Sequence, residues 1–325
     1  MSYILRLLSE NSGLSEASVR RIMLSAPSRY KIYYIKKRNG GLREIAQPAR
    51  EVKFLQRIFM DTTLQHLPVH EAATAYRPGA SILDNAQRHA NAGPILKMDF
   101  RNFFPSITSV DWVKYCKKYA CLTEHSDIWL TSHLLFKRNR DSGILQLAIG
   151  APSSPMLSNI LMFDFDRLIA PLVSQEYVIY TRYADDITFS ARRTGYFKNV
   201  RKNVVATLKT LDLPKLEVND EKTTFVTKKF HRQITGLTLA NDGQITIGRA
   251  KKRLLSAAVH HAVQGRLSVQ ALQRLSGYLA FVNSVEPQFL DVLRRRYGND
   301  SIMNIQKTVV LGNKIVSKEP GVWVI

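Results

Sequence analysis

The 325-residue sequence has only two cysteines, Cys116 and Cys121, which are too few for a disulfide framework and are typical of a reducing compartment. Their C-x4-C spacing, in a stretch with helical periodicity, would not bring both thiols to one helix face, which argues against a zinc site. No apolar run reaches 18 residues, and there is no signal-type N-terminus or lipidation motif. We therefore expect a cytoplasmic protein that does not bind a membrane.

Acidic residues are also scarce, because 26 Asp and Glu stand against 47 Lys and Arg, for a net charge of +21. A protein this basic usually binds a polyanion, most often nucleic acid, and an anionic membrane surface is the other interpretation. Apolar residues make up 45% of the chain, which is enough for a large core divided among two or three subdomains. The sequence shows no internal repeat and no low-complexity segment.

Two of the scarce acidic residues, Asp185 and Asp186, are adjacent and lie between two stretches of strand-like composition, 177–182 and 187–190. Adjacent carboxylates repel each other, and in a partly buried turn they need a neutralising cation. Mg²⁺ takes oxygen ligands and is the first candidate. An ordinary acidic hairpin turn is the alternative, since Asp is a common turn residue.

A third aspartate, Asp99, ends the apolar stretch 95–99, which has the composition of a buried strand. Two acidic sites at neighbouring strand ends can together hold two Mg²⁺ ions about 3.5–4 Å apart. Such ions activate an attacking hydroxyl and neutralise a triphosphate, which is the chemistry of nucleotidyl transfer. The alternatives are a non-catalytic RNA- or DNA-binding protein, which would not need three anions, and a nucleotide cyclase, which would not need the basic helical C-terminal part.

A basic hairpin is expected near the N-terminus. Residues 30–36 alternate like a strand, Arg38-Asn39-Gly40-Gly41 is a turn signal, and residues 42–46 return. Such a hairpin, through Arg43 and its neighbouring lysines, can close on a triphosphate or a template backbone; solvated surface charge is the alternative. The preceding residues 1–28 read as two short helices, either a DNA-reading helix-turn-helix or, as we favour, a small helical cap.

Several motifs of this sequence, spread over roughly residues 30–300, resemble those of reverse transcriptases and follow one another in the same order. Met98–Phe104 is similar to the first catalytic motif of the palm, and Tyr183-Ala184-Asp185-Asp186 to the catalytic hairpin. The Gly-Ala-Pro-Ser-Ser-Pro segment at 150–155 is similar to the loop that receives template and nucleotide, and Lys222 lies where the family has its later palm lysine. One departure is Ile149, where many members have glutamine.

Two further strings resemble bacterial retron reverse transcriptases in particular. Asn85-Ala86-x-x-His89 matches the Asn-Ala-x-x-His element typical of these enzymes, and Ile234-Thr235-Gly236 is similar to their Val-Thr-Gly triplet. A group II intron-like reverse transcriptase is the alternative within the family. Such enzymes usually carry maturase or endonuclease parts, and we see none in this sequence.

The resemblance implies an α+β fold, the right-hand polymerase fold with fingers, a palm built on an antiparallel sheet, and a helical thumb. The expected parts are an N-terminal helical cap (1–29), fingers (30–94), a palm (95–248) with a fingers insertion around 110–150, and a helical thumb (249–325).

The resemblance also implies an RNA-directed DNA polymerase that uses two Mg²⁺ ions and dNTPs. Retron enzymes bind a cognate structured non-coding RNA of the msr–msd type and copy part of it into single-stranded DNA. They prime from a 2′-OH of a guanosine within the RNA, so the product (msDNA) is a branched RNA–DNA hybrid. That product is used in antiphage defence alongside an effector protein.

The residues expected to be catalytic and to bind metal are Asp99, Asp185 and Asp186. Those expected to bind the nucleotide are Arg43, Phe104, Ala151, Pro152 and Lys222. We expect the Phe104 ring to exclude the 2′-OH of ribonucleotides, with Phe103 as the competitor. The residues expected to contact RNA are Asn85, His89, Ile234, Thr235, Gly236, Arg249, Lys251, Lys252 and Arg253.

Overall fold

The structure is a computed structural model that describes residues 2–37, 40–212 and 214–308, and these form two compact units. Unit 1 comprises the described residues up to Ser81 together with Ala92–Thr227. Unit 2 comprises Ile82–Asn91 and the described residues from Lys228 onward. The chain therefore contributes one short segment to unit 2 before it completes unit 1.

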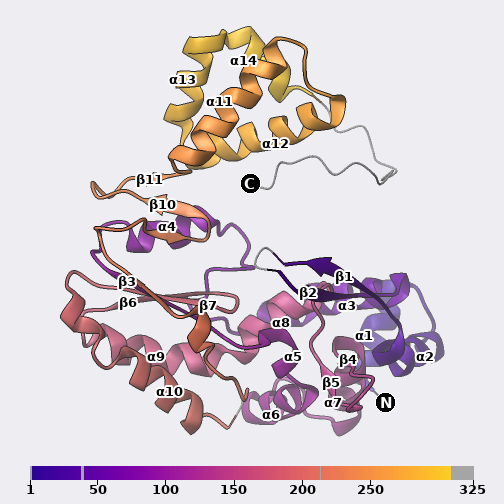
Figure 1. The fold of residues 1–325 in the computed structure, drawn as a ribbon. Helices are drawn as coiled ribbons and strands as arrows, with labels where there is room; N and C mark the ends of the chain where they lie inside the picture. Colours follow the sequence, from indigo (N-terminus) through magenta and orange to yellow (C-terminus); the bar gives the residue numbers. More distant parts are fainter. Residues whose placement is uncertain (1, 38–39, 213, 309–325) are drawn as a thin grey trace. The chain divides into compact units, whose positions relative to one another are not determined.

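The centre of unit 1 is a four-stranded antiparallel sheet in the order β6-β7-β3-β8 (Figure 1). The two central strands bury almost every side chain, as expected for strands covered on both faces. The predicted strand before Asp99 and the predicted strands around the Asp-Asp turn are confirmed. The bounds are β3 (Ile95–Asp99), β6 (Ile179–Tyr183), β7 (Asp186–Ser190) and β8 (Thr224–Val226).

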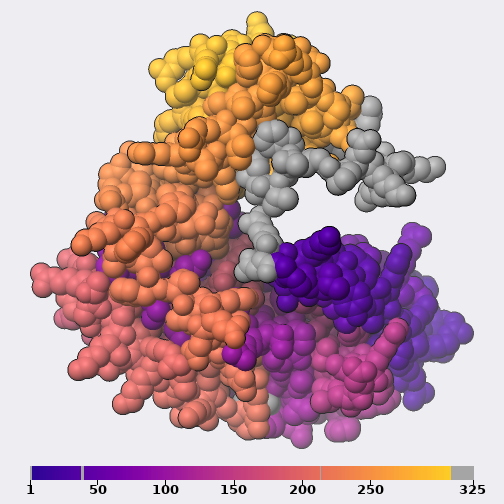
Figure 2. All heavy atoms as spheres, viewed as in Figure 1, coloured from indigo at the N-terminus to yellow at the C-terminus, as the bar shows by residue number. Residues whose placement is uncertain are grey.

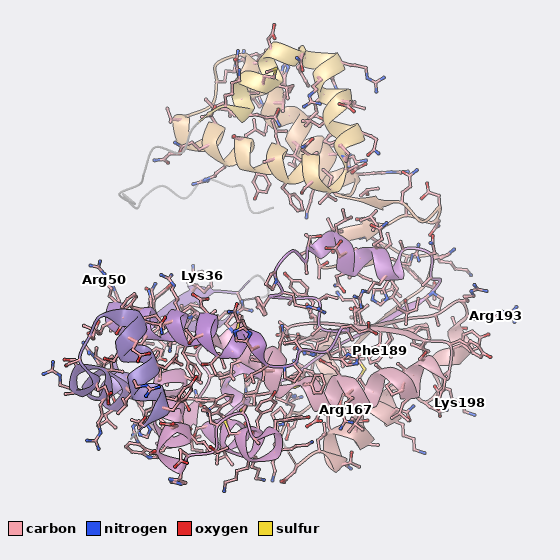
Figure 3. The ribbon with its side chains drawn as sticks, turned by 180° about the vertical axis from the view of Figure 1, so that it is seen from behind. Lys36, Arg50, Arg167, Phe189, Arg193 and Lys198 are labelled. Carbon is pink, nitrogen blue, oxygen red and sulfur yellow. The ribbon has the colours of Figure 1, made fainter. Side chains whose placement is uncertain are left out.

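Helices cover one face of this sheet. Helix α9 (Phe163–Ser174) packs on β6, and α10 (Val200–Thr210) packs on α9 (Figure 1). Phe165, Ile169 and Val173 recur every four residues along α9 and are all buried, which is the pattern of an amphipathic helix on a core. In Figure 3 the labelled Phe189 lies within the body of the unit, whereas four of the labelled cations lie at its outline, namely Lys36, Arg50, Arg193 and Lys198.

The N-terminal helices α1 (Tyr3–Ser12) and α2 (Glu16–Ser25) pack against α3 (Arg50–Thr62) and α7 (His125–Leu135). Ser2 and Ser15 cap the two helices by accepting hydrogen bonds from the amides of residues 5 and 18, at 3.1 and 3.3 Å. Their apolar faces lie in the common core of unit 1. This packing is what the helical-cap interpretation requires.

The predicted basic hairpin is confirmed as β1 (Tyr30–Lys36) and β2 (Leu42–Pro48), with Ile35 opposite Arg43. The returning strand runs two residues further than expected. Of the expected turn, Arg38 and Asn39 lie outside the described residues. In Figure 2 the hairpin and the N-terminal helices (indigo) form one continuous surface with the magenta segments of the same unit.

The two cysteines are closer than their spacing suggested. Helix α6 (Ser109–Tyr119) ends before Cys121, and Ala120 takes a left-handed conformation with φ 51°, so the chain turns back. The Sγ atoms of Cys116 and Cys121 are consequently 3.5 Å apart. The expectation that the thiols would point apart was wrong, because it assumed that the helix continues through both residues.

Unit 2 begins with α4 (Ile82–His89), which packs on a three-stranded sheet in the order β11-β10-β9. The strands are β9 (Gln233–Ile234), β10 (Leu237–Leu239) and β11 (Ile245–Thr246). A bundle of helices follows, with Leu255, Leu279 and Leu290 in its core. Its helices are α11 (Arg249–Val263), α12 (Val269–Val285), α13 (Pro287–Tyr297) and α14 (Asn299–Gln306). The expected helical thumb (249–325) is thus helical wherever it is described, apart from short connections; its residues 309–325 lie outside the described residues.

The remaining elements are short, apart from α8, and all belong to unit 1. They are η1 (Ala26–Ser28), η2 (Leu64–His66), α5 (Phe103–Ser106), β4 (Lys137–Arg138), β5 (Leu145–Gln146), α8 (Ser153–Leu161), η3 (Thr194–Phe197) and η4 (Asp220–Lys222). Among the described residues, no helix has the length and apolar character needed to cross a membrane.

Candidate active site

Strand pairing brings the three predicted aspartates together at one end of the central strands of the unit 1 sheet. Asp99 is the last residue of β3 and lies directly opposite Asp186, the first residue of β7. Asp185 occupies the turn between β6 and β7, and its carbonyl accepts a hydrogen bond from the amide of Phe100 at 3.3 Å. Residues far apart in the chain thus form one acidic cluster.

Lys222 supplies the cation of this cluster. Its ammonium lies 2.8 and 2.9 Å from the two carboxylate oxygens of Asp99. The lysine ends η4, which is held nearby because the amide of Asn219 donates to the carbonyl of Asp99 at 2.7 Å. Burial acts to lower the pKa of Lys222, but the hydrogen bond to Asp99 and the charges of the cluster raise it overall.

The carboxylates of the cluster are partly buried and repel one another, which favours binding of a cation. Burial, followed by the charges of Asp99 and Asp186, raises the pKa of Asp185 to about 6. Burial also raises the pKa of Asp186, against the opposing charge of Lys97. Crowded, partly buried carboxylate oxygens are the donor set that Mg²⁺ accepts, so the residues fit such an ion chemically. Within the described residues, no three His, Cys, Asp or Glu side chains are already arranged as a metal site.

A cavity of about 370 Å³ lies in the same unit and contains several of the predicted nucleotide-binding residues. Phe104, Ala151 and Pro152 line it. Its full lining is Gln47, Lys53, Arg57, Tyr76, Phe104, Ala148, Ile149, Gly150, Ala151, Pro152, Ser154 and Pro155. Its size falls within the range of small-molecule sites, roughly 300–1,000 Å³.

Phe103 and Phe104, the two candidates for contact with the sugar, have different surroundings. Phe103 is 3% exposed and stacks on Phe100, with ring centroids 5.9 Å apart, so it belongs to the core. Phe104 is half-buried and presents its ring to the cavity. Successive helical residues point about 100° apart, which is why adjacent rings meet different surroundings.

The loop before α8 packs tightly on strand β2. The amide of Ala46 donates to the carbonyl of Ile149 at 2.8 Å, and Gly150 has φ 119°. A Cβ atom at Gly150 would lie 3.0 Å from the carbonyl oxygen of Ala46, so only glycine fits without displacement. Ile149 reaches the cavity without offering a hydrogen bond. The hydroxyl of Ser154, which also lines it, is buried and has no partner among the described residues.

Several cavity residues were not anticipated from the sequence, among them Lys53, Arg57 and Tyr76. Lys53 and Arg57 are four apart on α3, beside its buried face, a spacing that could have marked a basic stripe. Tyr76 has φ 58° and stands in a loop that the sequence marked only by its turn residues. Burial, and then the charge of Asp185, raises the pKa of Tyr76, whereas the charge of Arg43 lowers it. Arg43 and Asp185 are therefore both close enough to Tyr76 to influence its hydroxyl.

The two retron-type strings meet in unit 2. Helix α4, which carries Asn85 and His89, packs on β10, and the Thr235 hydroxyl donates to the carbonyl of Ile82 at 3.2 Å. Asn85 is 1% exposed and His89 is fully buried. Burial, followed by the charge of Arg88, lowers the pKa of His89 to about 3, so this histidine is neutral at pH 7. These two side chains therefore lie inside the unit rather than on a surface that RNA could touch directly.

The four predicted RNA-binding cations at the start of α11 differ in their surroundings. Arg249 and Arg253 are exposed, and the ammonium of Lys251 donates to the carbonyl of Gly236 at 3.2 Å. Lys252 pairs with the half-buried Glu286 and lies 5.4 Å above the Phe289 ring. Lys252 therefore has an internal role that the sequence did not indicate.

The sequence model described as reverse transcriptase (RNA-dependent DNA polymerase) matches residues 35–239. The chain is 36% identical to the retron Ec83 reverse transcriptase of Escherichia coli, over 86% of this chain and 90% of that protein. It is 30% identical to the retron Ec86 reverse transcriptase of Escherichia coli, over 91% of each chain.

Among solved structures, telomerase from Candida albicans in complex with a TWJ fragment of telomeric RNA covers 88% of this chain and 56% of its own. It has a TM-score of 0.46 at 14% identity, a likeness too low to support an argument. The extensive sequence matches do support one. This chain belongs to the reverse transcriptase family, and within it to the retron reverse transcriptases; it is an RNA-directed DNA polymerase with the right-hand polymerase fold.

Proposed function

We propose that this enzyme copies part of a cognate structured RNA into single-stranded DNA and starts synthesis from a 2′-OH of a guanosine within that RNA. The product would be a branched RNA–DNA hybrid that serves antiphage defence together with an effector protein. Two features support the proposal: the relation to retron enzymes over most of the chain and the net charge of +21. The observation that carries the polymerase chemistry is the Asp99–Asp186 pairing beside Asp185.

In this proposal Asp99, Asp185 and Asp186 hold two Mg²⁺ ions, with the carbonyl of Phe100 as a further oxygen ligand. When bound, the ions activate the attacking hydroxyl and neutralise the triphosphate and the leaving pyrophosphate. Lys222, which neutralises Asp99 through a bidentate contact, is placed to orient a phosphate or to give a proton to the pyrophosphate.

The cavity receives the incoming dNTP. Lys53 and Arg57 on its wall, with Arg43 near Tyr76, supply positive charge for the triphosphate. Phe104 lies under the sugar, where its ring leaves no room for a 2′-OH and offers it no hydrogen bond. The main chain at Ala151 and Pro152 contacts the nucleotide or the template.

The structured RNA is held by the cations of α11. Arg249, Lys251 and Arg253 bind a stem through phosphates and 2′-OH groups, the usual mode for double-stranded RNA. Asn85, His89 and the segment Ile234–Gly236 act indirectly, because they set how α4 and the strands beneath it are packed. Lys252 contributes by fixing α11 to Glu286.

The test is synthesis by the full chain on the RNA that co-purifies with it. We expect sequencing of that RNA to find one structured species. Addition of dNTPs and Mg²⁺ should then give a single DNA whose 5′ end stays joined to RNA until an enzyme that cleaves 2′–5′ phosphodiester bonds releases it. Asp185→Asn should give no DNA.

The same assay separates the alternatives. A protein that binds RNA but makes no DNA on any primer–template would be a binding protein. An enzyme that extends annealed 3′-OH primers and never forms a branched product would fit a group II intron-like enzyme, and would refute the retron-type priming proposed here.

A further inference from the structure

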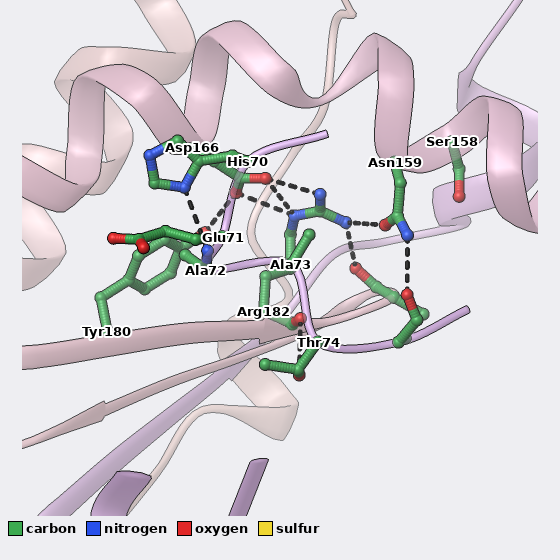
Figure 4. A network of polar contacts seen from close by, with 12 residues as sticks. His70, Glu71, Ala72, Ala73, Thr74, Ser158, Asn159, Asp166, Tyr180 and Arg182 are labelled. Carbon is green, nitrogen blue, oxygen red and sulfur yellow. Dashed lines mark hydrogen bonds and ion pairs between the residues drawn. The ribbon is translucent and has the colours of Figure 1, made fainter. Parts of the chain in front are cut away.

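A buried ion pair lies beneath the turn that carries Asp185. The guanidinium of Arg182 contacts Asp166 through Nε at 2.9 and 3.2 Å and through Nη2 at 2.6 Å, and both side chains are fully buried (Figure 4). The hydroxyl of Tyr180 donates to the same carboxylate at 2.7 Å. Asp166 belongs to α9 and Arg182 to β6, so this pair joins the helical layer to the sheet.

The remaining nitrogen of Arg182 extends this pair to two backbone carbonyls. Nη1 donates to the carbonyl of Ala184 at 3.2 Å and to the side-chain oxygen of Asn159 at 3.1 Å. The amide nitrogen of Asn159 donates in turn to the carbonyl of Ala75 at 2.7 Å (Figure 4). Asn159 therefore uses its acceptor toward Arg182 and its donor toward Ala75.

Both carbonyls belong to residues that immediately precede a site residue. Ala184 is followed by Asp185, and Ala75 is followed by Tyr76, which lines the nucleotide cavity. Ala184 and Tyr76 have φ values of 57° and 58°, a left-handed conformation that is sterically unfavourable for a residue with a Cβ. Such strain persists only where surrounding contacts over-determine the backbone.

The backbone of Arg182 reinforces the same connection. Its amide donates to the carbonyl of Ala72 at 2.7 Å, and its carbonyl accepts from the amide of Thr74 at 2.8 Å. The segment before Tyr76 therefore runs alongside β6, and two backbone hydrogen bonds of Arg182 hold it there. Asn159 lies on α8, which begins directly after the loop that lines the cavity.

Stability alone does not account for these residues. A buried ion pair costs so much desolvation that well-packed apolar side chains often hold a fold equally well. What apolar side chains could not provide is a rigid set of donors aimed at two carbonyls in two different parts of the site. A planar guanidinium and an amide, each with fixed hydrogen-bond directions, provide that.

We propose that Arg182 and Asn159 are positioning residues that set the Asp185 turn and the Tyr76 wall of the nucleotide cavity relative to each other. Arg182 acts mainly on the metal-binding turn, and Asn159 mainly on the cavity. This proposal rests on the proposed function, which identifies the metal site and the nucleotide cavity. It adds that each of the two sites depends mainly on a different positioning residue.

Two substitutions separate the two ends of the network. Arg182→Lys keeps a positive charge for Asp166 but cannot also reach Ala184 and Asn159, so the concentration of Mg²⁺ needed for half-maximal rate should rise on the order of tenfold, with a lower kcat. Asn159→Asp keeps the acceptor for Arg182 but places an oxygen against the carbonyl of Ala75. The KM for dNTP should then rise on the order of tenfold, with a smaller change in kcat.

Two measurements on the full chain do not depend on turnover. In metal-free protein, hydrogen exchange should become faster in peptides covering 183–190 for Arg182→Lys and in peptides covering 72–78 for Asn159→Asp. On a primer ended by a dideoxynucleotide, Asn159→Asp should weaken dNTP binding more than Arg182→Lys does. If Arg182→Lys does not fold, Asn159→Asp, which keeps the side-chain volume, carries the test alone.

A matched control is Val204→Ala, which removes buried volume on α10 outside the network. It should lower Tm and leave the Mg²⁺ requirement, the KM for dNTP and both exchange patterns unchanged. If the network variants behave like Val204→Ala, the network is merely structural and the proposal is overturned. Failure of the wild-type chain to extend any primer–template would instead overturn the proposed function.

Discussion

Unit 1 and unit 2 use polar and charged residues in different ways. Unit 1 holds charged side chains in its interior: Asp99 is 6% exposed, and Arg182 and Asp166 are fully buried. In unit 2, residues 228–308 contain 13 Lys and Arg against 4 Asp and Glu, and exposed cations such as Arg249 and Arg253 lie on a helix surface. The buried residues of its retron-type element, Asn85 and His89, are uncharged at pH 7.

The difference follows from what each unit is proposed to do. A reaction centre needs fixed charges in a poorly solvated place, where each interaction is strong and only weakly screened. A surface that binds a polyanion needs many solvated cations, whose effect is additive and is screened by salt. We therefore expect catalysis and RNA binding to respond separately to substitutions in the two units.

The largest expected effect is that of Asp185→Asn or Asp99→Asn in unit 1. Removing one carboxylate from the proposed two-metal site should reduce DNA synthesis by on the order of 10³-fold or more, because transition-state charge is no longer neutralised. RNA affinity should stay within about twofold of wild type, since these residues are not among the surface cations that release counterions. Primer extension and filter binding measure the two quantities.

The matched control for the aspartate substitutions is Asp212→Asn, an exposed carboxylate of unit 1 that pairs with Lys114. It should leave both DNA synthesis and RNA affinity unchanged. An Asp185→Asn enzyme that still polymerised near the wild-type rate would refute the metal-site assignment.

The second expected effect is on the salt dependence of RNA affinity, which should change with substitutions in unit 2. Replacing Arg249, Lys251 and Arg253 together by glutamine should weaken RNA binding and reduce the slope of log K against log salt by about 2–3, at roughly 0.7–0.9 per lost phosphate contact. Affinity measured across a salt series tests this. Rates on a saturating generic primer–template should change little.

The control for charge alone is the glutamine triple at Arg193, Lys198 and Lys202, three exposed cations of unit 1. Its slope should remain close to that of the wild type. Equal losses of slope in the two triples would mean that the RNA is not held preferentially by α11.

The third effect is on substrate choice. Phe104→Val should lower the ratio of kcat/KM for dNTP over rNTP by about tenfold or more, because the ring that occupies the space of the 2′-OH is gone. Phe103→Val is the control, since that ring packs in the core against Phe100. It should lower Tm and leave the ratio unchanged; the reverse result would place the register of this motif off by one residue.

The smallest effect is a pH dependence of stability in unit 2. His89 has a folded-state pKa of about 3, below its ordinary value of 6.5, so the unfolded chain takes up its proton first. Its contribution is complete above pH 6.5 and is lost as pH falls from 6.5 toward 3, by up to about 1.4 kcal/mol per pH unit. Urea unfolding at pH 7 and pH 5.5 should show a smaller acid loss for His89→Gln than for wild type. An exposed histidine, changed as His66→Gln, should show the wild-type loss.

Local sequence patterns predicted much of what the structure contains. The strand pair around Asp185, the strand ending in Asp99 and the basic hairpin follow from periodicity and turn residues within short windows. The Cys116–Cys121 contact was missed because one helix end, at Tyr119, was placed too late. The helix ends there because Ala120 adopts a left-handed conformation, and an alanine gives no sequence signal for that conformation.

The sequence by itself determined which chemistry this protein has available: three aspartates on strand ends, an aromatic pair after Asp99, and an excess of cations toward the C-terminal part. Only the tertiary structure decided which side chains share a site. Lys53 and Arg57 reach the cavity, and Arg182 reaches Asp166, Asn159 and Ala184, through contacts between elements that are distant in the chain. Short windows of sequence carry the preferences of one element, whereas burial and hydrogen-bond direction arise only when several elements pack together.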